Sequence, residues 1–430
     1  MNSADSSSKC QHIPGLIPLL ECDIMALIGD MLIHDETLVP LDKRGMITHC
    51  RNLENVSCKD FDLETPLVAK RVRDFFRLQE NLPELDGNIP LKTWAKAIHA
   101  AIDGRPSEVA FRSSGSTGES VQHILPYAYM EHEATSVAPF FPIRRIVGVM
   151  PRHHCFAFVF SLLLTRHMQL PSLHFLPLPT QEFIAYLQED DLVVAFPFFW
   201  DAIIRLGVPL PGILPLSAGS PCPAGVMDAL IRAGAKGVRE IYGASELGAI
   251  GYRHITSPGG EAHTPFTLLP QWAVHNNGER SIMRRLPQDM LPLISPEMLL
   301  GTTDTDGVPL VRCPALPDAL AWHGERLFRP LARKDKAVQV AGQNVYPSKI
   351  AALMATHPYV RECRVRLMRA EEGNRLKAFV VPAHHAPPES PLRAELLAWC
   401  KNSLTAHEQP KTITIGEALP QTTHGKDADW

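Results

Sequence analysis

The chain has 430 residues, of which 45% are hydrophobic and 20% charged, and its formal net charge is −4. This length exceeds what one hydrophobic core usually serves, so the sequence predicts two or more domains. The ordinary composition excludes a wholly disordered chain, and the mixing of charge signs argues against a nucleic-acid footprint or a polybasic membrane patch.

Nine cysteines are spaced singly, without a Cys-x-x-Cys pair. This spacing gives no signal for a zinc cluster, and an odd number of cysteines fits free thiols in a reducing compartment. The longest apolar stretch, Cys155 to Leu164, is about half the length that a bilayer crossing needs. The first residues lack a basic stretch followed by a sufficient apolar run, so no secretory signal is predicted. We therefore expect a cytoplasmic protein without a membrane segment.

The apolar spacing in the first quarter of the chain predicts helices, as around 68–78 and 94–102. From about residue 107, short apolar runs alternate with helical patterns, which favours an α/β body of stacked sheets and helices. The expected strands are 146–150, 191–195 and 214–217, and the expected helices are 181–187, 200–206 and 224–233.

The segment 266–311 is rich in Pro, Thr and Gly and is expected to be irregular, and 330–335 is expected to act as a linker. Beyond it the pattern predicts a small α+β unit. Its expected strands are 338–340, 360–368 and 376–381, and its expected helices are 347–355 and 392–404.

The stretch Phe111-Arg-Ser-Ser-Gly-Ser-Thr-Gly-Glu-Ser120 concentrates hydroxyls and glycines after a strand-like segment. Glycines permit tight turns that point several backbone N–H groups at an anion, and Ser and Thr add hydroxyl donors. The stretch is neither a Walker A loop nor the elbow of a serine hydrolase, because the spacing of each differs. We interpret it as a phosphate-binding loop, although Ser/Gly-rich segments are commonly ordinary loops.

Five further segments follow this loop in a fixed order, and together the six resemble the motifs of the adenylate-forming superfamily. This superfamily includes acyl-CoA synthetases, aryl-acid ligases and non-ribosomal adenylation domains, and the resemblance is closest to small 4-coumarate- or phenylacetate–CoA-ligase-like members. The segments are Ser113-Ser-Gly-Ser-Thr-Gly118, Pro151-Arg-His-His-Cys-Phe156, Ile241-Tyr-Gly-Ala-Ser-Glu246, Ala332-Arg-Lys-Asp335, Gly342-Gln-Asn-Val-Tyr-Pro347 and Leu419-Pro-Gln-Thr-Thr-His-Gly-Lys426.

The resemblance implies an N-terminal domain, 1–332, that binds ATP and the acid, and a mobile C-terminal lid, 333–430. It also implies ATP and Mg²⁺ as cofactors. The implied contacts to the β- and γ-phosphates are Ser113, Ser114, Gly115, Ser116, Thr117 and Gly118, and further implied ATP-binding residues are Gly219, Tyr242, Gly243, Ser245, Asp318 and Arg333.

Two of these roles have a direct physical reason. Tyr242 would stack on adenine, and Glu246 would hold magnesium, which prefers carboxylate oxygens. The alternative for Tyr242 is a buried tyrosine at a strand end. Glu246 taken alone would more commonly be a solvated glutamate at a helix start, and its place four residues after Tyr242 favours the functional role. Asp318 would bind the ribose hydroxyls, although Asp304 or Asp306 could take that role instead.

Lys426 is the implied catalytic lysine, because a flexible cation carried by the lid can bridge the attacking carboxylate and the developing charge at phosphorus. Asp335 is the implied hinge about which the lid rotates before a thiol attacks. That thiol would belong to coenzyme A or to the phosphopantetheine arm of a carrier protein.

An aromatic acid suits the candidate pocket, because the residues near its expected position are apolar or flat. These candidates are His154, Phe156, Phe196, Phe198, Phe199 and Ala218, although clustered phenylalanines are usually core residues. Two departures from the superfamily pattern stand out. The lysine that often follows the phosphate loop is missing near Val121 and Gln122, and Gln339 replaces a lysine ahead of the glycine segment.

The sequence therefore predicts an ATP-dependent acid–thiol ligase that forms an acyl-AMP from an aromatic acid such as a benzoate, hydroxybenzoate or cinnamate, and that has no nucleic-acid or membrane partner. Two alternatives remain open at this point. One is a fatty-acyl-AMP ligase, which would have a long tunnel in place of a short slot. The other is a non-catalytic ligand-binding or sensor protein that kept the fold.

Overall fold

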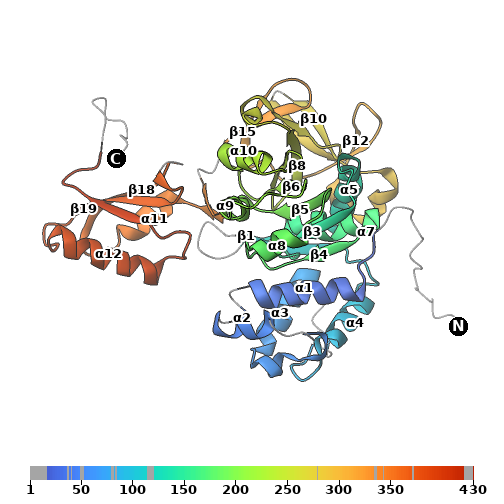
Figure 1. Ribbon diagram of the computed structural model, residues 1–430, viewed down its shortest axis with the longest axis horizontal. Helices are drawn as coiled ribbons and strands as arrows, with labels where there is room; N and C mark the ends of the chain where they lie inside the picture. The colour runs from blue at the N-terminus through green and yellow to red at the C-terminus, as the bar shows by residue number, and fades with distance from the viewer. Residues whose placement is uncertain are drawn as a thin grey trace.

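The computed structural model describes residues 17–35, 38–39, 41–48, 53–78, 82, 85–113, 121–277, 279–333, 337–341, 343–369, 372–420 and 430. A helical N-terminal part is followed by a central body of sheets and helices and by a smaller C-terminal unit at one side (Figure 1). The predicted α/β class is confirmed.

The N-terminal part consists of helices whose apolar faces pack into the core of the body. Ile24 and Ile28 of the first helix and Trp94 of the fourth are fully buried in this shared core. The elements are α1 (Glu21–His34), α2 (Leu41–Thr48), η1 (Leu53–Asn55), η2 (Cys58–Phe61), α3 (Thr65–Phe76) and α4 (Leu91–Ala101). The two helices expected here from apolar spacing are confirmed.

A nine-stranded sheet in the order β14-β15-β9-β8-β7-β6-β5-β3-β4 forms the centre of the body. Pairing is parallel from β7 to β4 and antiparallel from β7 to β14. The strands are β3 (Arg145–Gly148), β4 (Ser172–His174), β5 (Asp191–Ala195), β6 (Leu214–Ser217), β7 (Val238–Ala244), β8 (Gly248–Ile255), β9 (Phe266–Leu268), β14 (Asp318–Trp322) and β15 (Leu327–Arg333).

Helices cover both faces of this sheet. Successive side chains of β5 point to opposite faces and are apolar, so Val193 is buried in one core and Val194 in the other. One core contains α8 (Gln181–Tyr186), α9 (Pro197–Arg205) and α10 (Ala224–Arg232). The opposite core contains α5 (Tyr127–Val137), α6 (Cys155–Ala157), η4 (Phe158–Leu163) and α7 (Leu164–Met168), with η3 (Ala138–Phe140) beside them. The three strands and three helices expected in this region are confirmed to within a few residues.

The candidate phosphate loop joins a separate antiparallel pair of strands, β1 (Glu108–Ser113) and β2 (Val121–Pro126). Ser113 lies opposite Val121 in this pair, and residues 114–120 are outside the described residues.

The segment 266–311 is not irregular, and that prediction is wrong. It contributes β9 to the large sheet and forms a four-stranded sheet of order β10-β11-β13-β12. The short strands carry polar residues, so the apolar alternation typical of a strand is not visible in the sequence. These residues form strands because they pair with strands elsewhere along the chain. The elements are η5 (Gly260–His263), β10 (Trp272–Asn277), β11 (Glu279–Arg285), η6 (Gln288–Leu293), η7 (Pro296–Met298), β12 (Leu299–Thr303) and β13 (Pro309–Val311).

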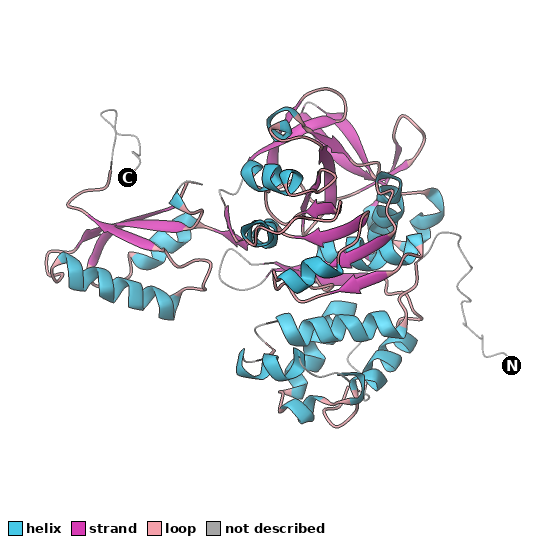
Figure 2. Cartoon of the chain, viewed as in Figure 1, coloured by secondary structure: helices cyan, strands magenta, loops and turns pink. Residues whose placement is uncertain are grey.

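The C-terminal unit has its own hydrophobic core, which includes Val340, Met354, Leu396 and Ile413. Two helices pack against a three-stranded sheet of order β18-β19-β20, and Figure 2 shows α12 along one face of these strands. The elements are β16 (Val338–Val340), β17 (Gln343–Val345), α11 (Pro347–Met354), β18 (Val360–Leu367), β19 (Leu376–Pro382), α12 (Glu389–Ser403) and β20 (Thr412–Ile415). The expected linker 330–335 is corrected in part, since β15 extends through Arg333.

Candidate active site

Tyr242, near the end of the central strand β7, contacts Asp318, the first residue of β14. The Tyr242 hydroxyl donates a hydrogen bond of 2.6 Å to Asp318 Oδ2, across 76 positions of sequence. The other carboxylate oxygen, Asp318 Oδ1, is buried and has no hydrogen-bond partner among the described residues. A buried acceptor without a partner is costly, so this oxygen is suited to a hydroxyl supplied by a ligand.

The two alternative aspartates are engaged elsewhere. Asp304 lies 2.6 Å from Arg285 and caps its own turn by accepting the N–H groups of Asp306 and Val308. Asp306 also pairs with Arg285, at 2.9 Å. Asp318 is therefore the carboxylate that the fold brings to Tyr242.

Glu246 lies in the tight turn, residues 245–247, between β7 and β8. The next residue, Gly248, has φ +78°, and a Cβ at this position would lie 2.4 Å from Glu133 Oε2. Glycine is required here both for its backbone conformation and for this close approach. Glu246 is half-buried, and within the described part of the chain no hydrogen bond or ion pair is recorded for its carboxylate. Carboxylate oxygens are the ligands that a hard cation such as Mg²⁺ prefers.

Buried polar side chains of Glu133 and Arg284 form hydrogen bonds with the backbone in and next to this turn. Glu133 on α5 accepts the Ala249 N–H at 3.1 Å, and Arg284 on β11 donates to the Leu247 carbonyl. The guanidinium of Arg284 lies 3.9 Å from Glu133. Burial raises the pKa of Glu133 to about 7, because the lost hydration outweighs the attraction of the arginine.

Two aromatic rings complete the network. The guanidinium carbon of Arg284 lies 4.6 Å from the centre of the Tyr129 ring and 4.5 Å from that of Trp272, whose Nε1–H donates to the Ala249 carbonyl at 2.7 Å. Because the Leu247 carbonyl in the turn and both backbone groups of Ala249 just after it are held, the turn that carries Glu246 is rigidly supported.

His123, which sequence reasoning missed, lies beside Glu246. Burial lowers the pKa of the His123 imidazole, and the nearby Glu246 carboxylate acts in the opposite direction. His123 is the third residue of β2, the strand that follows residues 114–120 in sequence. The fold thus brings Glu246 to the strand that leaves the candidate phosphate loop. A single histidine on a strand gives no sequence signal for such a position.

His154 lies at the start of α6, in a segment that is tied to the N-terminal helices. Burial lowers the pKa of the His154 imidazole to about 4, so the ring is neutral at neutral pH. Asp30 on α1 accepts hydrogen bonds from the Arg152 N–H, Nε and Nη2 at 2.7, 2.8 and 2.9 Å. These bonds fix the backbone two residues before His154.

The same helix also holds the strand that enters the phosphate loop. Asp35, the C-cap of α1, lies 2.9 Å from Arg71 and 3.8 Å from Arg112. Arg112 on β1 is also 3.7 Å from Asp74 on α3 and immediately precedes Ser113. Helix α1 therefore anchors both the entry to the loop and the His154 segment.

The candidate aromatic residues do not lie together in one slot. Phe156 is in the core on one face of the sheet, where its ring packs 4.7 Å from that of Phe160. Phe199, only 1% exposed, is in the core on the other face, and Phe196 packs against both cores. Phe198 is 66% exposed. In this structure Phe199 therefore packs as a core residue.

Ala218 and Gly219 follow β6. Ala218 is buried, whereas a Cβ built on Gly219, which has φ +89°, would meet no atom within 4 Å. The backbone at Gly219 is therefore open to a flat ligand. Gly243 is tightly packed instead, since a Cβ there would lie 2.5 Å from the Gly248 carbonyl oxygen.

Several of the predicted positions are outside the described residues. They are Ser114, Gly115, Ser116, Thr117, Gly118, Asp335, Gly342 and Lys426, and the side chains of Ser113 and Arg333 are not described either.

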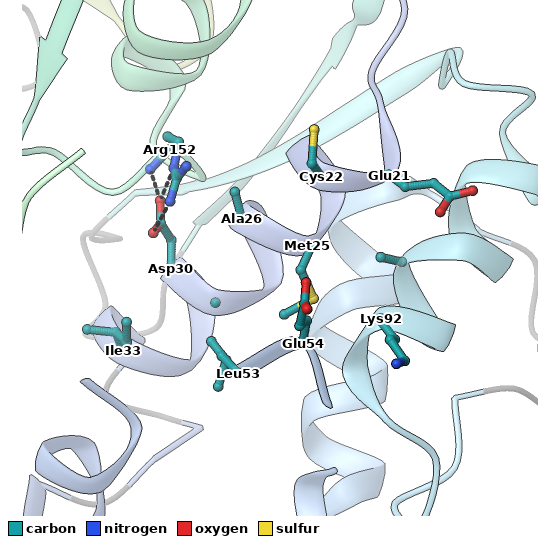
Figure 3. Close-up of a pocket in the computed structure, with 12 residues that line it drawn as sticks. Glu21, Cys22, Met25, Ala26, Asp30, Ile33, Leu53, Glu54, Lys92 and Arg152 are labelled. Carbon is teal, nitrogen blue, oxygen red and sulfur yellow. Dashed lines mark hydrogen bonds and ion pairs between the residues drawn. The ribbon is translucent and has the colours of Figure 1, made fainter. Parts of the chain in front are cut away.

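A cavity of about 760 Å³ lies between α1, η1 and α4, with Asp30 and Arg152 at one end (Figure 3). Its lining includes Met25, Leu53 and Lys92 but none of the predicted pocket residues. This groove is therefore not the expected site for the acid. None of the helices in the described ranges has the length and hydrophobicity to cross a membrane.

Known proteins are similar to this chain along most of its length. A 4-coumarate–CoA ligase of Rhodobacter capsulatus is 31% identical over 373 residues, which cover 84% of this chain and 86% of that protein. The chain belongs to the adenylate-forming superfamily. A 4-coumarate–CoA ligase of Halorhodospira halophila is 29% identical over 84% of this chain and 85% of its own length, and residues 349–426 match the AMP-binding enzyme C-terminal domain.

Solved structures agree on the fold of this superfamily member. An o-succinylbenzoate CoA synthetase of Bacillus subtilis has a TM-score of 0.54 at 18% identity, covering 74% of this chain and 67% of that one. The adenylation domain AlmE of Vibrio cholerae has a TM-score of 0.52 at 18% identity, covering 72% of this chain and 63% of that one. With its 4-coumarate–CoA ligase relatives, this adenylate-forming chain is an acid–thiol ligase, an enzyme that activates an acid with ATP.

Proposed function

We propose that this enzyme activates an aromatic carboxylic acid as an acyl-AMP and transfers the acyl group to the thiol of coenzyme A. The observation that carries the nucleotide site is the bond between Tyr242 and Asp318, whose Oδ1 is buried and has no hydrogen-bond partner among the described residues. The aromatic class is supported by relatives named 4-coumarate–CoA ligases. A carrier-protein thiol is the second acceptor that the experiments below distinguish.

The first step forms a bond from a carboxylate oxygen to the α-phosphorus of ATP and breaks the bond from that phosphorus to the β-phosphate oxygen, so pyrophosphate leaves. In the second step the thiol sulfur attacks the acyl carbon, AMP leaves, and the thiol proton passes to solvent. Both reactants of the first step are anions, so charge neutralisation and alignment are the main demands on the protein.

We assign the described residues to these demands as follows. Tyr242, whose ring packs against those of Phe266 and Phe328, would place the adenine. Asp318 would accept hydrogen bonds from the ribose hydroxyls. Glu246 would hold Mg²⁺, which neutralises phosphate charge when bound. The network of Glu133 and Arg284 keeps the Glu246 turn in place.

The remaining roles belong to residues that the structure does not describe. The loop 113–118 would bind the β- and γ-phosphates, Lys426 would bridge the carboxylate and the α-phosphate, and Asp335 would be the hinge between 1–332 and a mobile lid, 333–430. A cytoplasmic location fits the cysteines, because all seven whose placement is described are free thiols.

The test is isotope exchange between pyrophosphate and ATP with a panel of benzoate-, hydroxybenzoate-, cinnamate- and fatty-acid substrates. We expect exchange with an aromatic acid, and formation of the corresponding thioester when coenzyme A is added. Exchange without thioester would point to a carrier protein, and exchange with long-chain acids alone would overturn the aromatic class. No exchange with any acid would overturn the proposed reaction.

Glu246→Gln tests the metal site in the same assay. The amide keeps the shape of the side chain and removes its charge, so exchange should fall by at least about 100-fold and the Mg²⁺ concentration needed for half-maximal exchange should rise. Glu261, a partly exposed glutamate on η5, provides the matched control Glu261→Gln. An unchanged Mg²⁺ dependence in Glu246→Gln would show that another group holds the metal.

A further inference from the structure

Arginines on β18 hold the chain just before the segment that carries Lys426. Arg361 Nη2 donates to the Glu417 carbonyl at 3.0 Å, and Arg364 Nη1 donates to the Pro420 carbonyl at 3.1 Å. Both bonds run from side chains of one strand to backbone oxygens, so they fix the path of the chain up to residue 420.

The same strand holds the chain just after that segment. Arg366 Nη2 donates to the backbone oxygen of Trp430 at 2.9 Å, and Lys377 Nζ donates to the same oxygen. Arg366 and Lys377 are directly opposed in the β18–β19 pair, so their side chains form one cationic clamp on one face of the sheet.

The indole ring of Trp430 is held as well as its backbone. The ring centre lies 5.1 Å from the Arg366 guanidinium carbon and 5.8 Å from Lys377 Nζ, and it packs edge-on against Phe379 at 5.9 Å. Cations over an aromatic face and a T-shaped aromatic pair each stabilise such contacts.

Glu372 keeps the two cations together. It lies 3.0 Å from Arg366 Nη1 and 2.7 Å from Lys377 Nζ. Hydrogen bonds from Arg366 and Lys377 hold the pKa of Glu372 well below its usual range. The clamp is therefore a built site of two cations, one carboxylate and one aromatic wall, and Trp430 occupies it.

The position of Trp430 in the sequence gives the clamp its significance. Lys426 is four residues before Trp430, so even a fully extended chain places their Cα atoms within about 14 Å of each other. Fixing the chain at 420 and at 430 removes most of the conformations that residues between them could sample, before any substrate binds.

We infer that Trp430 is a positioning residue for adenylation: docked on Arg366, Lys377 and Phe379, it restricts the segment that presents Lys426 to the reacting phosphate. This inference rests on the role of Lys426 in the proposed function. It assigns to Trp430 no contact with a substrate.

The test compares Trp430→Ala with Trp430→Phe, which keeps an aromatic face for the two cations. The control is Trp399→Ala, because Trp399 packs on His357 in the same unit and has no contact with the clamp among the described residues. For Trp430→Ala we expect kcat of acid-dependent exchange to fall about 10- to 100-fold with KM for ATP and acid nearly unchanged. Trp430→Phe should recover most of the rate.

Two further measurements separate positioning from a general loss of stability. Thioester formation from a supplied acyl-AMP and coenzyme A should stay within about twofold of wild type in Trp430→Ala, because Lys426 is assigned to the first step only. In a Lys426→Ala background, Trp430→Ala should cause no further loss of exchange.

The outcomes distinguish this inference from the function on which it rests. If the wild-type enzyme shows no exchange between pyrophosphate and ATP with any acid, the proposed function itself is wrong. A wild-type enzyme with exchange, together with Trp430→Ala at the wild-type rate, would overturn the inference alone. Equal losses in both half-reactions, or equal losses in Trp399→Ala, would assign Trp430 to the stability of the C-terminal unit and would also overturn it.

Discussion

Replacement of Glu133 by Gln should change how the stability of the enzyme depends on pH. The amide oxygen can still accept the Ala249 N–H that Glu133 accepts at 3.1 Å, while the buried charge beside Arg284 is removed. The substitution therefore isolates the titration of one carboxyl group behind the Glu246 turn.

The magnitude follows from the pKa of this group. Burial raises the pKa of Glu133 from an ordinary 4.5 to about 7. A proton is then bound more tightly in the folded than in the unfolded protein, so the contribution of Glu133 to stability is fully present below pH 4.5. It is lost as the pH rises toward 7, by about 1.4 kcal/mol per pH unit and about 3 kcal/mol in total.

The assay is urea unfolding of wild type and Glu133→Gln at several pH values between 5 and 8, followed by tryptophan fluorescence. Trp272 is a suitable reporter, because it is fully buried beside Arg284. Relative to wild type, Glu133→Gln should gain about 2–3 kcal/mol in free energy of unfolding between pH 5 and pH 8. The exposed Glu21→Gln serves as the control and should show no such trend.

A difference between wild type and Glu133→Gln that stays constant over this range would refute the reasoning. It would mean that the attraction of Arg284 and the backbone N–H fully offsets the cost of burying the carboxylate, so that the group titrates as in the unfolded chain.

Two other substitutions test contacts described above. Tyr242→Phe removes the 2.6 Å bond to Asp318, and we expect KM for ATP to rise about tenfold with little change in stability; a wild-type KM measured by exchange would contradict the assigned nucleotide site. Asp30→Asn weakens three hydrogen bonds from Arg152, and we expect a loss of about 3 kcal/mol in stability together with a higher KM for the acid. Thermal unfolding measures the first effect and exchange kinetics the second, and an unchanged melting temperature would argue against the role of Asp30.

Local patterns in the sequence were sufficient for much of the fold. The strand 338–340 and the helix that begins at Pro347 were predicted at their observed positions, because apolar period and helix-start signals are local. The segment 266–311 was not predicted, because its strands depend on pairing such as that of Arg284 with Val311, which no local pattern encodes.

In the candidate site too, some features were predictable from the sequence and others depend on contacts between distant residues. The resemblance to the superfamily selected Asp318, the carboxylate that meets Tyr242, but nothing in the sequence joins Asp30 to Arg152, which are 122 positions apart. The aromatic candidates differ in their surroundings, since even the neighbours Phe198 and Phe199 are exposed and buried respectively. Phenylalanine type alone does not tell which face of an element a ring occupies.

Helix α1 carries both Asp30 and, at its C-terminal cap, Asp35. Asp35 is paired with Arg112 on the strand that leads to the phosphate loop, and Asp30 with Arg152 in the segment before His154. Because one rigid rod bears both attachments, a displacement of that rod would shift the nucleotide side and the acid side in concert. Sequence changes on the outer surface of the N-terminal helices could thereby alter affinity for ATP and for the acid at the same time, without touching either ligand.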